Sequence, residues 1–217
     1  MAEYVTAESA AGPVEELDVS APEDSAPFTY TVTEGIADAL AKLNATLWVS
    51  TYQVGKLAVF RAVDGRVSML PRTFDKAMGF AVDQQQLSIA TRYQVWTLKN
   101  ETILAPRLKP EGTHDGFYLP RSSHVTGNID AHEVAFGNEE PVAGSVSVPG
   151  RTRSRSIWVV NTLFSCLCTL DSDYSFVPRW RPPFVTRQVR KDRCHLNGLA
   201  MQNGQPKYVT CFAATDT

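Results

Sequence analysis

Short runs of apolar residues alternate with polar, turn-forming residues along most of the chain, and one phrase recurs. Each copy is an apolar strand of about four or five residues that ends on a small residue and a threonine or a similar residue. The copies begin at Leu47, Leu87, Ile157 and Lys207. The first three copies continue into a second strand-like stretch. This recurrence predicts a structure that is built from repeated units of antiparallel strands.

A second apolar phrase precedes three of these strands. It begins at Met78, at His132 and at Asn197, and a turn or loop separates it from the strand that follows. Asn203-Gly204 is one such turn, because this dipeptide favours a tight hairpin. A unit of about 40–50 residues, lengthened by insertions, is typical of a β-propeller blade. We therefore predict an all-β fold, either a β-propeller or an incomplete propeller of about three to four blades.

The last copy, which begins at Lys207, stops before its unit is complete. Propellers close with about four to eight blades, and closure removes exposed strand edges. We therefore expect the chain to be a fragment, truncated at its C-terminal end, or to close with partners. Residues 33–43 are the best helix candidate, with Thr33 as the cap and with Ile36, Leu40 and Leu43 on one face.

Charge divides the chain into two parts. The net charge of the 217 residues is −2, but residues 1–41 contain no Lys or Arg. Residues 1–28 are rich in Ala, Glu, Ser and Pro, a composition that predicts a disordered acidic tail. Residues 29–217 form the predicted propeller-like domain. No apolar run is long enough for a membrane span and no secretory signal is present, so we expect a soluble, cytoplasmic protein with reduced cysteines.

Three stretches carry a resemblance to a known family. These stretches are 157–171 (IWVVNTLFSCLCTLD), 174–183 (YSFVPRWRPP) and 192–200 (DRCHLNGLA). They resemble a bacterial conserved-hypothetical family whose members have a propeller-like domain of unknown function. The resemblance implies that part of the usual family length is missing after Thr217 and that the insertion at 137–156 is unusual. It implies no established activity.

A weaker resemblance concerns Asn197-Gly198-Leu199-Ala200. It is similar to a phrase of the gluconolactonase and strictosidine-synthase-like propellers, in which the Asn coordinates a metal on the propeller axis. When the repeated units are aligned on Asn197, the residues at the same position in the other units are His132 and Met78. Met78 is not an oxygen ligand, which argues against calcium, a cation that requires several oxygen ligands.

The candidate chemistry lies at the beginnings of the inner strands. His132 lies beside Asp130 and Glu133, and His195 lies two residues before Asn197, on the same side if that segment is extended. His132, His195 and Asn197 together are candidate ligands of a divalent transition metal. Alternatively, His132 or His195 acts as a general base, or both histidines only satisfy backbone carbonyls. The sequence leaves these three alternatives open.

A second candidate surface is basic and aromatic. Arg179, Trp180 and Arg181 are consecutive in a proline-rich segment, and we expect them to form a binding surface. The domain as a whole is not strongly basic, so a protein or small-molecule partner is expected rather than nucleic acid. The sequence thus predicts a propeller-type binding or scaffold module. The alternative is a metal-dependent, hydrolase-like enzyme with an axial His/Asn site, and the sequence does not decide whether the protein is an enzyme.

Overall fold

Thirteen strands and one α-helix organise the residues that the computed structural model describes, which are 29–139 and 155–216. The predicted acidic tail at 1–28 and the central part of the insertion at 137–156 lie outside these residues. All helices and strands belong to the unit that spans Thr33–Thr217. Within the residues described, no helix has the length and apolarity that a membrane crossing requires.

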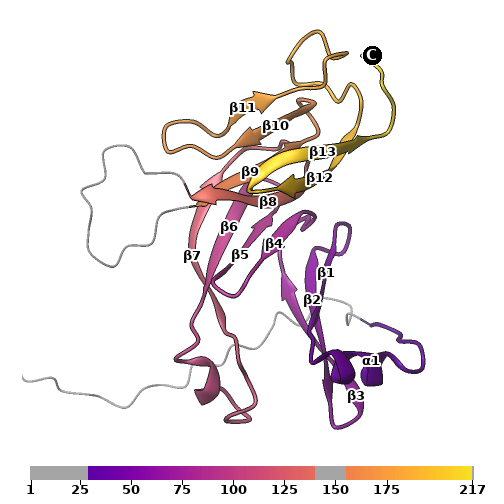
Figure 1. Cartoon of the computed structure of the whole chain (residues 1–217), viewed down its shortest axis with the longest axis vertical. Coiled ribbons are helices and arrows are strands. Elements are labelled where there is room, and N and C mark those ends of the chain that lie inside the picture. Colours follow the sequence, from indigo (N-terminus) through magenta and orange to yellow (C-terminus); the bar gives the residue numbers. More distant parts are fainter. Residues whose placement is uncertain (1–28, 140–154, 217) are drawn as a thin grey trace, which may run out of the picture. The chain divides into compact units, whose positions relative to one another are not determined.

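The strands form four antiparallel sheets, and each sheet consists of strands that are consecutive in the sequence (Figure 1). The first sheet has the order β1-β2-β3, with the strands β1 (Leu47–Thr51), β2 (Lys56–Val63) and β3 (Arg66–Thr73). The second has the order β4-β5-β6-β7, with the strands β4 (Phe80–Val82), β5 (Gln86–Ala90), β6 (Gln94–Asn100) and β7 (Tyr118–Val125).

The third sheet has the order β8-β9-β10-β11, with the strands β8 (Ala131–Glu139), β9 (Arg155–Asn161), β10 (Cys166–Thr169) and β11 (Val177–Trp180). The fourth sheet pairs β12 (Leu196–Gln202) with β13 (Gln205–Cys211). The prediction of a mostly β protein with repeated antiparallel units is confirmed. None of the four sheets closes on itself within the described part of the chain.

Tight turns set the register of the hairpins. Asn203 and Gly204 join β12 to β13 with positive φ angles of 52° and 70°, the backbone conformation that the Asn-Gly pair was predicted to supply. Asp64 and Gly65 join β2 to β3 with φ angles of 50° and 71°. Both turns have positive φ at their two central residues, which matches the right-handed twist of the flanking strands.

Three buried clusters connect each sheet to the next one in the chain. The first joins Leu57 of the first sheet to Leu87 and Ile89 of the second, and a second cluster joins the second sheet to the third. The third cluster joins the third sheet to Leu196 of the fourth. Burial of one large aliphatic side chain contributes about 1.5–3 kcal/mol. These clusters therefore stabilise the packing of each sheet against the next one in the chain.

The first strands of neighbouring sheets approach each other closely. β4 contacts β8, and β8 contacts β12. Only glycine fits at position 79, just before β4, because a Cβ on Gly79 would lie 2.5 Å from the Cα of Glu133 in β8. This close packing brings the beginnings of the first strands together, where the candidate histidines were predicted.

Helix α1 (Ile36–Leu43) is shorter than the predicted helix at 33–43. Its N-cap is Gly35 in the left-handed conformation, with φ of 85° and no side-chain capping bond, so the prediction that Thr33 caps the helix is wrong. The Thr33 carbonyl instead accepts a hydrogen bond from the Ile36 N–H. Of the predicted apolar face only Leu40 is buried, while Leu43, at the end of the helix, remains exposed.

Candidate functional site

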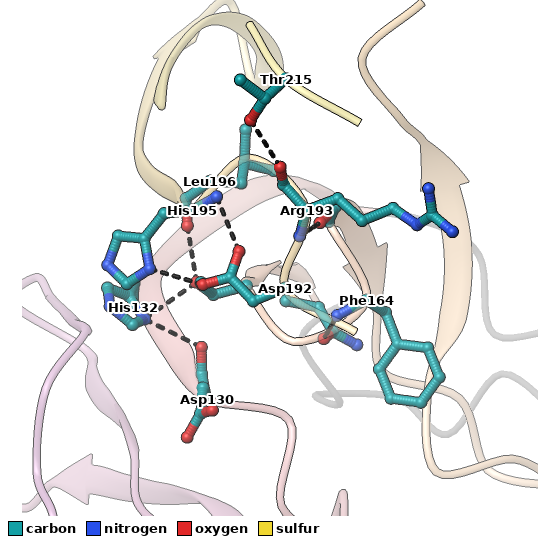
Figure 2. Close-up of polar contacts among 11 residues, drawn as sticks. Asp130, His132, Phe164, Asp192, Arg193, His195, Leu196 and Thr215 are labelled. Carbon is teal, nitrogen blue, oxygen red and sulfur yellow. Dashed lines mark hydrogen bonds and ion pairs between the residues drawn. The ribbon is translucent and has the colours of Figure 1, made fainter. Parts of the chain in front are cut away.

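Two histidines that are distant in the sequence meet at the beginnings of β8 and β12. His132 is the second residue of β8, and His195 immediately precedes β12. Their ring centroids lie 4.8 Å apart, and the ring planes are nearly perpendicular at 87° (Figure 2). The structure thus brings together two of the three residues for which sequence reasoning predicted chemistry.

Hydrogen bonds determine which nitrogen of His132 carries a proton. Its Nδ1 lies 2.9 Å from the carbonyl oxygen of Asp130 and 2.8 Å from the hydroxyl oxygen of Thr162. The Thr162 hydroxyl donates its proton to the Leu196 carbonyl at 2.6 Å, so towards His132 it can only accept. Both neighbours of Nδ1 are therefore acceptors, and Nδ1 is the donor. In the neutral ring, Nε2 of His132 consequently has a free lone pair.

His195 has an equivalent anchor, supplied by a carboxylate. Its Nδ1 lies 2.6 Å from Oδ2 of Asp192, and Oδ1 of the same carboxylate accepts the backbone N–H of His195 at 2.7 Å. Asp192 therefore fixes both the ring and the backbone of His195. Because Nδ1 donates to the carboxylate, Nε2 of the neutral ring again has a free lone pair. The side chain of His195 is 48% exposed, so this nitrogen belongs to an accessible site.

The backbone is strained on both sides of the histidine pair. His195 has a φ of 48° and Asp130 has a φ of 47°. Left-handed backbone is uncommon for residues other than glycine and costs about 1–3 kcal/mol per residue. Such strain persists only where the surroundings hold the conformation, as the hydrogen bonds of Asp192 do here. Strained residues of this kind are concentrated at ligand and active sites.

Arg193 holds the loop that carries Asp192 and His195. Its backbone N–H donates to the Ser165 hydroxyl at 3.0 Å, and its carbonyl accepts a bond from Thr215 at 2.7 Å (Figure 2). Its guanidinium pairs with Asp216 at 2.6 Å. Hydrogen bonds from Thr186 and from Arg193 lower the pKa of that carboxyl, so Asp216 remains ionised and the loop remains tied down.

The carboxyl group of Glu133 lies next to the site along β8. Burial raises its pKa, and the N–H of Val134, which donates to Oε1 at 3.1 Å, offsets only part of this effect. Glu133 is also the residue whose backbone is packed against Gly79. The side chain following His132 is thus held in a partly dehydrated position where its charged form is disfavoured.

Asn197, the third predicted residue, is exposed in β12 and makes no hydrogen bond to the histidine pair in the described part of the chain. Nor do the described residues contain a group of three or more His, Cys, Asp or Glu side chains that could hold a metal ion. The two imidazoles fit a transition metal better than calcium, but they supply only two of the usual four zinc ligands. The predicted site of His132, His195 and Asn197 remains a prediction.

The basic segment is separate from this site. Arg179 and Trp180 end β11, the last strand in the order of the third sheet, and Arg181 follows them. Arg179 donates to the Thr169 hydroxyl at 2.8 Å, and Arg181 donates to the Val185 carbonyl. Trp180 is 41% exposed. Both arginines thus support neighbouring segments of their own chain, and their role as a binding surface remains a prediction.

Sequence reasoning missed two residues of the site, Thr162 and Asp192. Thr162 ends the apolar phrase that begins at Ile157, so the recurring threonine was a usable signal. Asp192 lies three residues before His195, in a stretch with no regular spacing. Its role depends on the left-handed backbone of His195, which residue types do not reveal.

The fold and the site define a class of protein: a β-rich chain of stacked antiparallel sheets, with two anchored imidazoles where the sheets meet. The chain belongs to the family described as Domain of unknown function (DUF4915), whose model matches residues 34–217. Membership of an uncharacterised family, as the sequence predicted, is therefore confirmed. Comparison with curated proteins and with solved structures found no match.

Proposed function

We propose that this chain is a ligand-binding module built from propeller-type blades, and that the ligand binds where His132 and His195 meet. One observation carries the proposal. Both rings donate their Nδ1 protons to fixed acceptors of the chain, so each neutral ring has a lone pair on Nε2, and the side chain of His195 is 48% exposed. Histidines that only fill space do not require two independent anchors and a strained backbone.

The arrangement of the sheets supports the propeller part of the proposal. Successive sheets pack face to face in chain order, and the first strands β4, β8 and β12 are neighbours, as the inner strands of blades are. The recurring phrase occupies β5, β9 and β13, which are second strands, but also β1. Within the described residues, therefore, the first sheet has the second to fourth strands of a blade and the fourth sheet has the first two. This is the pattern of an open row of blades.

A fragment screen by ligand-observed NMR tests the proposed site. We expect several small polar aromatic molecules to bind the wild-type chain and to lose binding in both His132→Ala and His195→Ala. His114→Ala is the matched control, because His114 is a partly exposed histidine that instead contacts Arg61 and the Lys109 carbonyl. Fragments that bind equally well to the wild type and to both site variants would contradict the proposal.

A second candidate, a metal-dependent and hydrolase-like enzyme, is favoured by one specific feature of the same residues. Imidazoles that ligate a metal through Nε2 usually donate Nδ1–H to a carbonyl or a carboxylate. His132 donates to the Asp130 carbonyl, and His195 donates to the Asp192 carboxylate. Asn197, two residues after His195, would be the third protein ligand. A bound metal would supply Lewis-acid activation of water, while this chain would orient the two rings.

Titration with Co²⁺, followed by visible absorption, separates this candidate from a metal-free binding module. The enzyme hypothesis predicts one tightly bound ion per chain and loss of the signal in His132→Ala, His195→Ala and Asn197→Ala. It also predicts that the loaded protein hydrolyses an activated ester. Absence of a stoichiometric complex, or identical binding in the three variants, would eliminate the metal-dependent enzyme and leave the binding module in place.

A further inference from the structure

A cavity opens beside the histidine site, at the turns of the first two sheets. It has a volume of about 490 Å³ and is lined by residues 52–55, Thr73, residues 75–76 and Arg92. A second cavity of about 10 Å³ shares Tyr52, Lys76 and Arg92 with it and is also lined by His132. The larger volume suits a small organic molecule, and the smaller one suits a single water or a polar atom of a ligand.

Backbone hydrogen bonds hold the walls of the larger cavity together. The Phe74 N–H donates to the Gly55 carbonyl at 2.9 Å, and the Arg92 N–H donates to the Asp75 carbonyl at 2.9 Å. Gly55 has a φ of 64°, and a Cβ there would lie 3.1 Å from the Phe74 carbonyl oxygen. The three segments that form the walls are thus fixed without a ligand, and a preformed site loses less free energy on binding.

The charges around this cavity leave a positive excess. The single acidic side chain of the lining, Asp75, pairs with Arg92 through two hydrogen bonds of 2.8 Å and 3.3 Å. Lys76 donates to the Tyr52 hydroxyl at 3.1 Å, and its Nζ lies 5.0 Å from the centre of the Tyr52 ring. Among the residues that the structure describes, no carboxylate lies within ion-pair distance of Lys76. Its charge is positioned but not neutralised.

A second unneutralised ammonium lies next to the lining. Lys56 donates to the hydroxyl of Thr73 at 2.7 Å, and Thr73 is part of the cavity wall. Lys56 also has no ion-pair partner in the described part of the chain. The apolar surface at the cavity comes from the Tyr52 ring and from Val54, which is 56% exposed.

We propose that this cavity binds a small organic anion, whose carboxylate or phosphate group pairs with Lys76 while its apolar part lies against Tyr52 and Val54. The proposal rests on the proposed function, because it identifies the chemical class of the ligand that would bind there. The larger cavity shares lining residues with the smaller one, and His132 lines the smaller one. Lys76 is the main determinant, since the guanidinium of Arg92 is already engaged by Asp75.

Calorimetric titration with phenyl phosphate, benzoate and phenol tests the cavity. The two anions share an aromatic ring with phenol, so the proposal predicts saturable binding of at least one anion and none of phenol at the same concentrations. The difference between phenyl phosphate and benzoate identifies the preferred anionic group. Binding should weaken as the salt concentration rises, because salt screens the ion pair with Lys76.

Lys76→Gln should reduce anion binding by about tenfold or more, the equivalent of losing about 1.4 kcal/mol. Lys76→Arg, which retains the charge, should restore part of the binding. Lys207→Gln is the matched control, because the Lys207 ammonium likewise lies over a tyrosine ring, at 5.9 Å from the centre of Tyr208. If neither anion binds, or if the two glutamine variants lose binding equally, the proposal is overturned.

The two proposals fail in different ways. If Lys76→Gln abolishes anion binding but His132→Ala has no effect, the cavity binds anions and its connection to the histidine site is wrong. If fragments bind at the histidines but no anion binds at Lys76, the proposed function stands and this inference is overturned. Circular dichroism of each variant establishes that the fold is retained.

Discussion

Replacement of Gly79 by alanine tests the close contact between the second and third sheets. The added Cβ would lie 2.5, 2.6 and 2.8 Å from three backbone atoms of Glu133. Non-bonded carbons prefer about 3.5–4.0 Å, so β4 and β8 must separate by roughly 1 Å. A backbone cannot rotate away as a side chain can. We therefore expect the upper end of the range for overpacking, a loss of about 3 kcal/mol in the free energy of unfolding.

Urea denaturation, followed by tryptophan fluorescence, measures this loss. With a slope of about 2 kcal/mol per molar urea, a loss of about 3 kcal/mol lowers the midpoint by about 1.5 M. Gly116→Ala is the matched control, since the atoms nearest to a Cβ there are side-chain atoms of Asn100 and Tyr118, at 3.4 Å or more. The reasoning is refuted if the two variants unfold within about 0.5 kcal/mol of each other, the spread of ordinary surface substitutions.

Two further substitutions examine the site itself. Thr162→Val removes the hydroxyl that joins His132 to the Leu196 carbonyl, so we expect a loss of about 1–2 kcal/mol in the free energy of unfolding, while the Asp130 carbonyl keeps the His132 proton on Nδ1. Nitrogen NMR of the imidazoles identifies the protonated nitrogen, and Thr51→Val, which removes a hydroxyl bonded within its own hairpin, is the control that should leave His132 unchanged. A His132 ring that is protonated on Nε2 in Thr162→Val contradicts the tautomer argument. Glu133→Gln should stabilise the protein at neutral pH, because burial raises the pKa of this carboxyl and the folded state disfavours its charge. The wild type is relatively most stable while Glu133 is protonated, and it loses that stability as the pH rises through the raised pKa. The difference in thermal stability between the wild type and Glu133→Gln should therefore vanish below about pH 4. A difference that persists below that pH refutes the argument from the raised pKa of Glu133.

The sequence predicted the strands well because short apolar runs and turn residues act locally. The phrase that begins at Leu87 became most of β5, in which all five residues are buried, and Asn203-Gly204 formed the turn between β12 and β13. The meeting of His132 and His195 also followed from local information, since His132 is in register with Asn197, His195 lies two residues before Asn197, and the beginnings of successive units must lie near each other if the units stack. These predictions required no knowledge of contacts between particular side chains.

The remaining part of the site depends on long-range contacts that residue types do not encode. The helix begins at Ile36, and its N-cap is Gly35 in the left-handed conformation rather than Thr33 with a side-chain capping bond. Asp192 became the partner of His195 only because the intervening loop is held by Arg193 and because His195 adopts positive φ. A backbone conformation of this kind is selected by the whole fold and is invisible to periodicity.

Hydroxyl groups that donate from one sheet to the next connect the architecture to the site. In the first sheet Ser50 donates to the Met78 carbonyl at 2.5 Å, and in the third sheet Thr162 donates to the Leu196 carbonyl at 2.6 Å. Each bond links the end of one strand, β1 or β9, to the beginning of the next sheet, so it holds neighbouring sheets together. At Thr162 the same oxygen also accepts the Nδ1 proton of His132. A contact that stabilises the stacking of sheets therefore also fixes the protonation of the imidazole, and the free Nε2 is a consequence of how the sheets are joined.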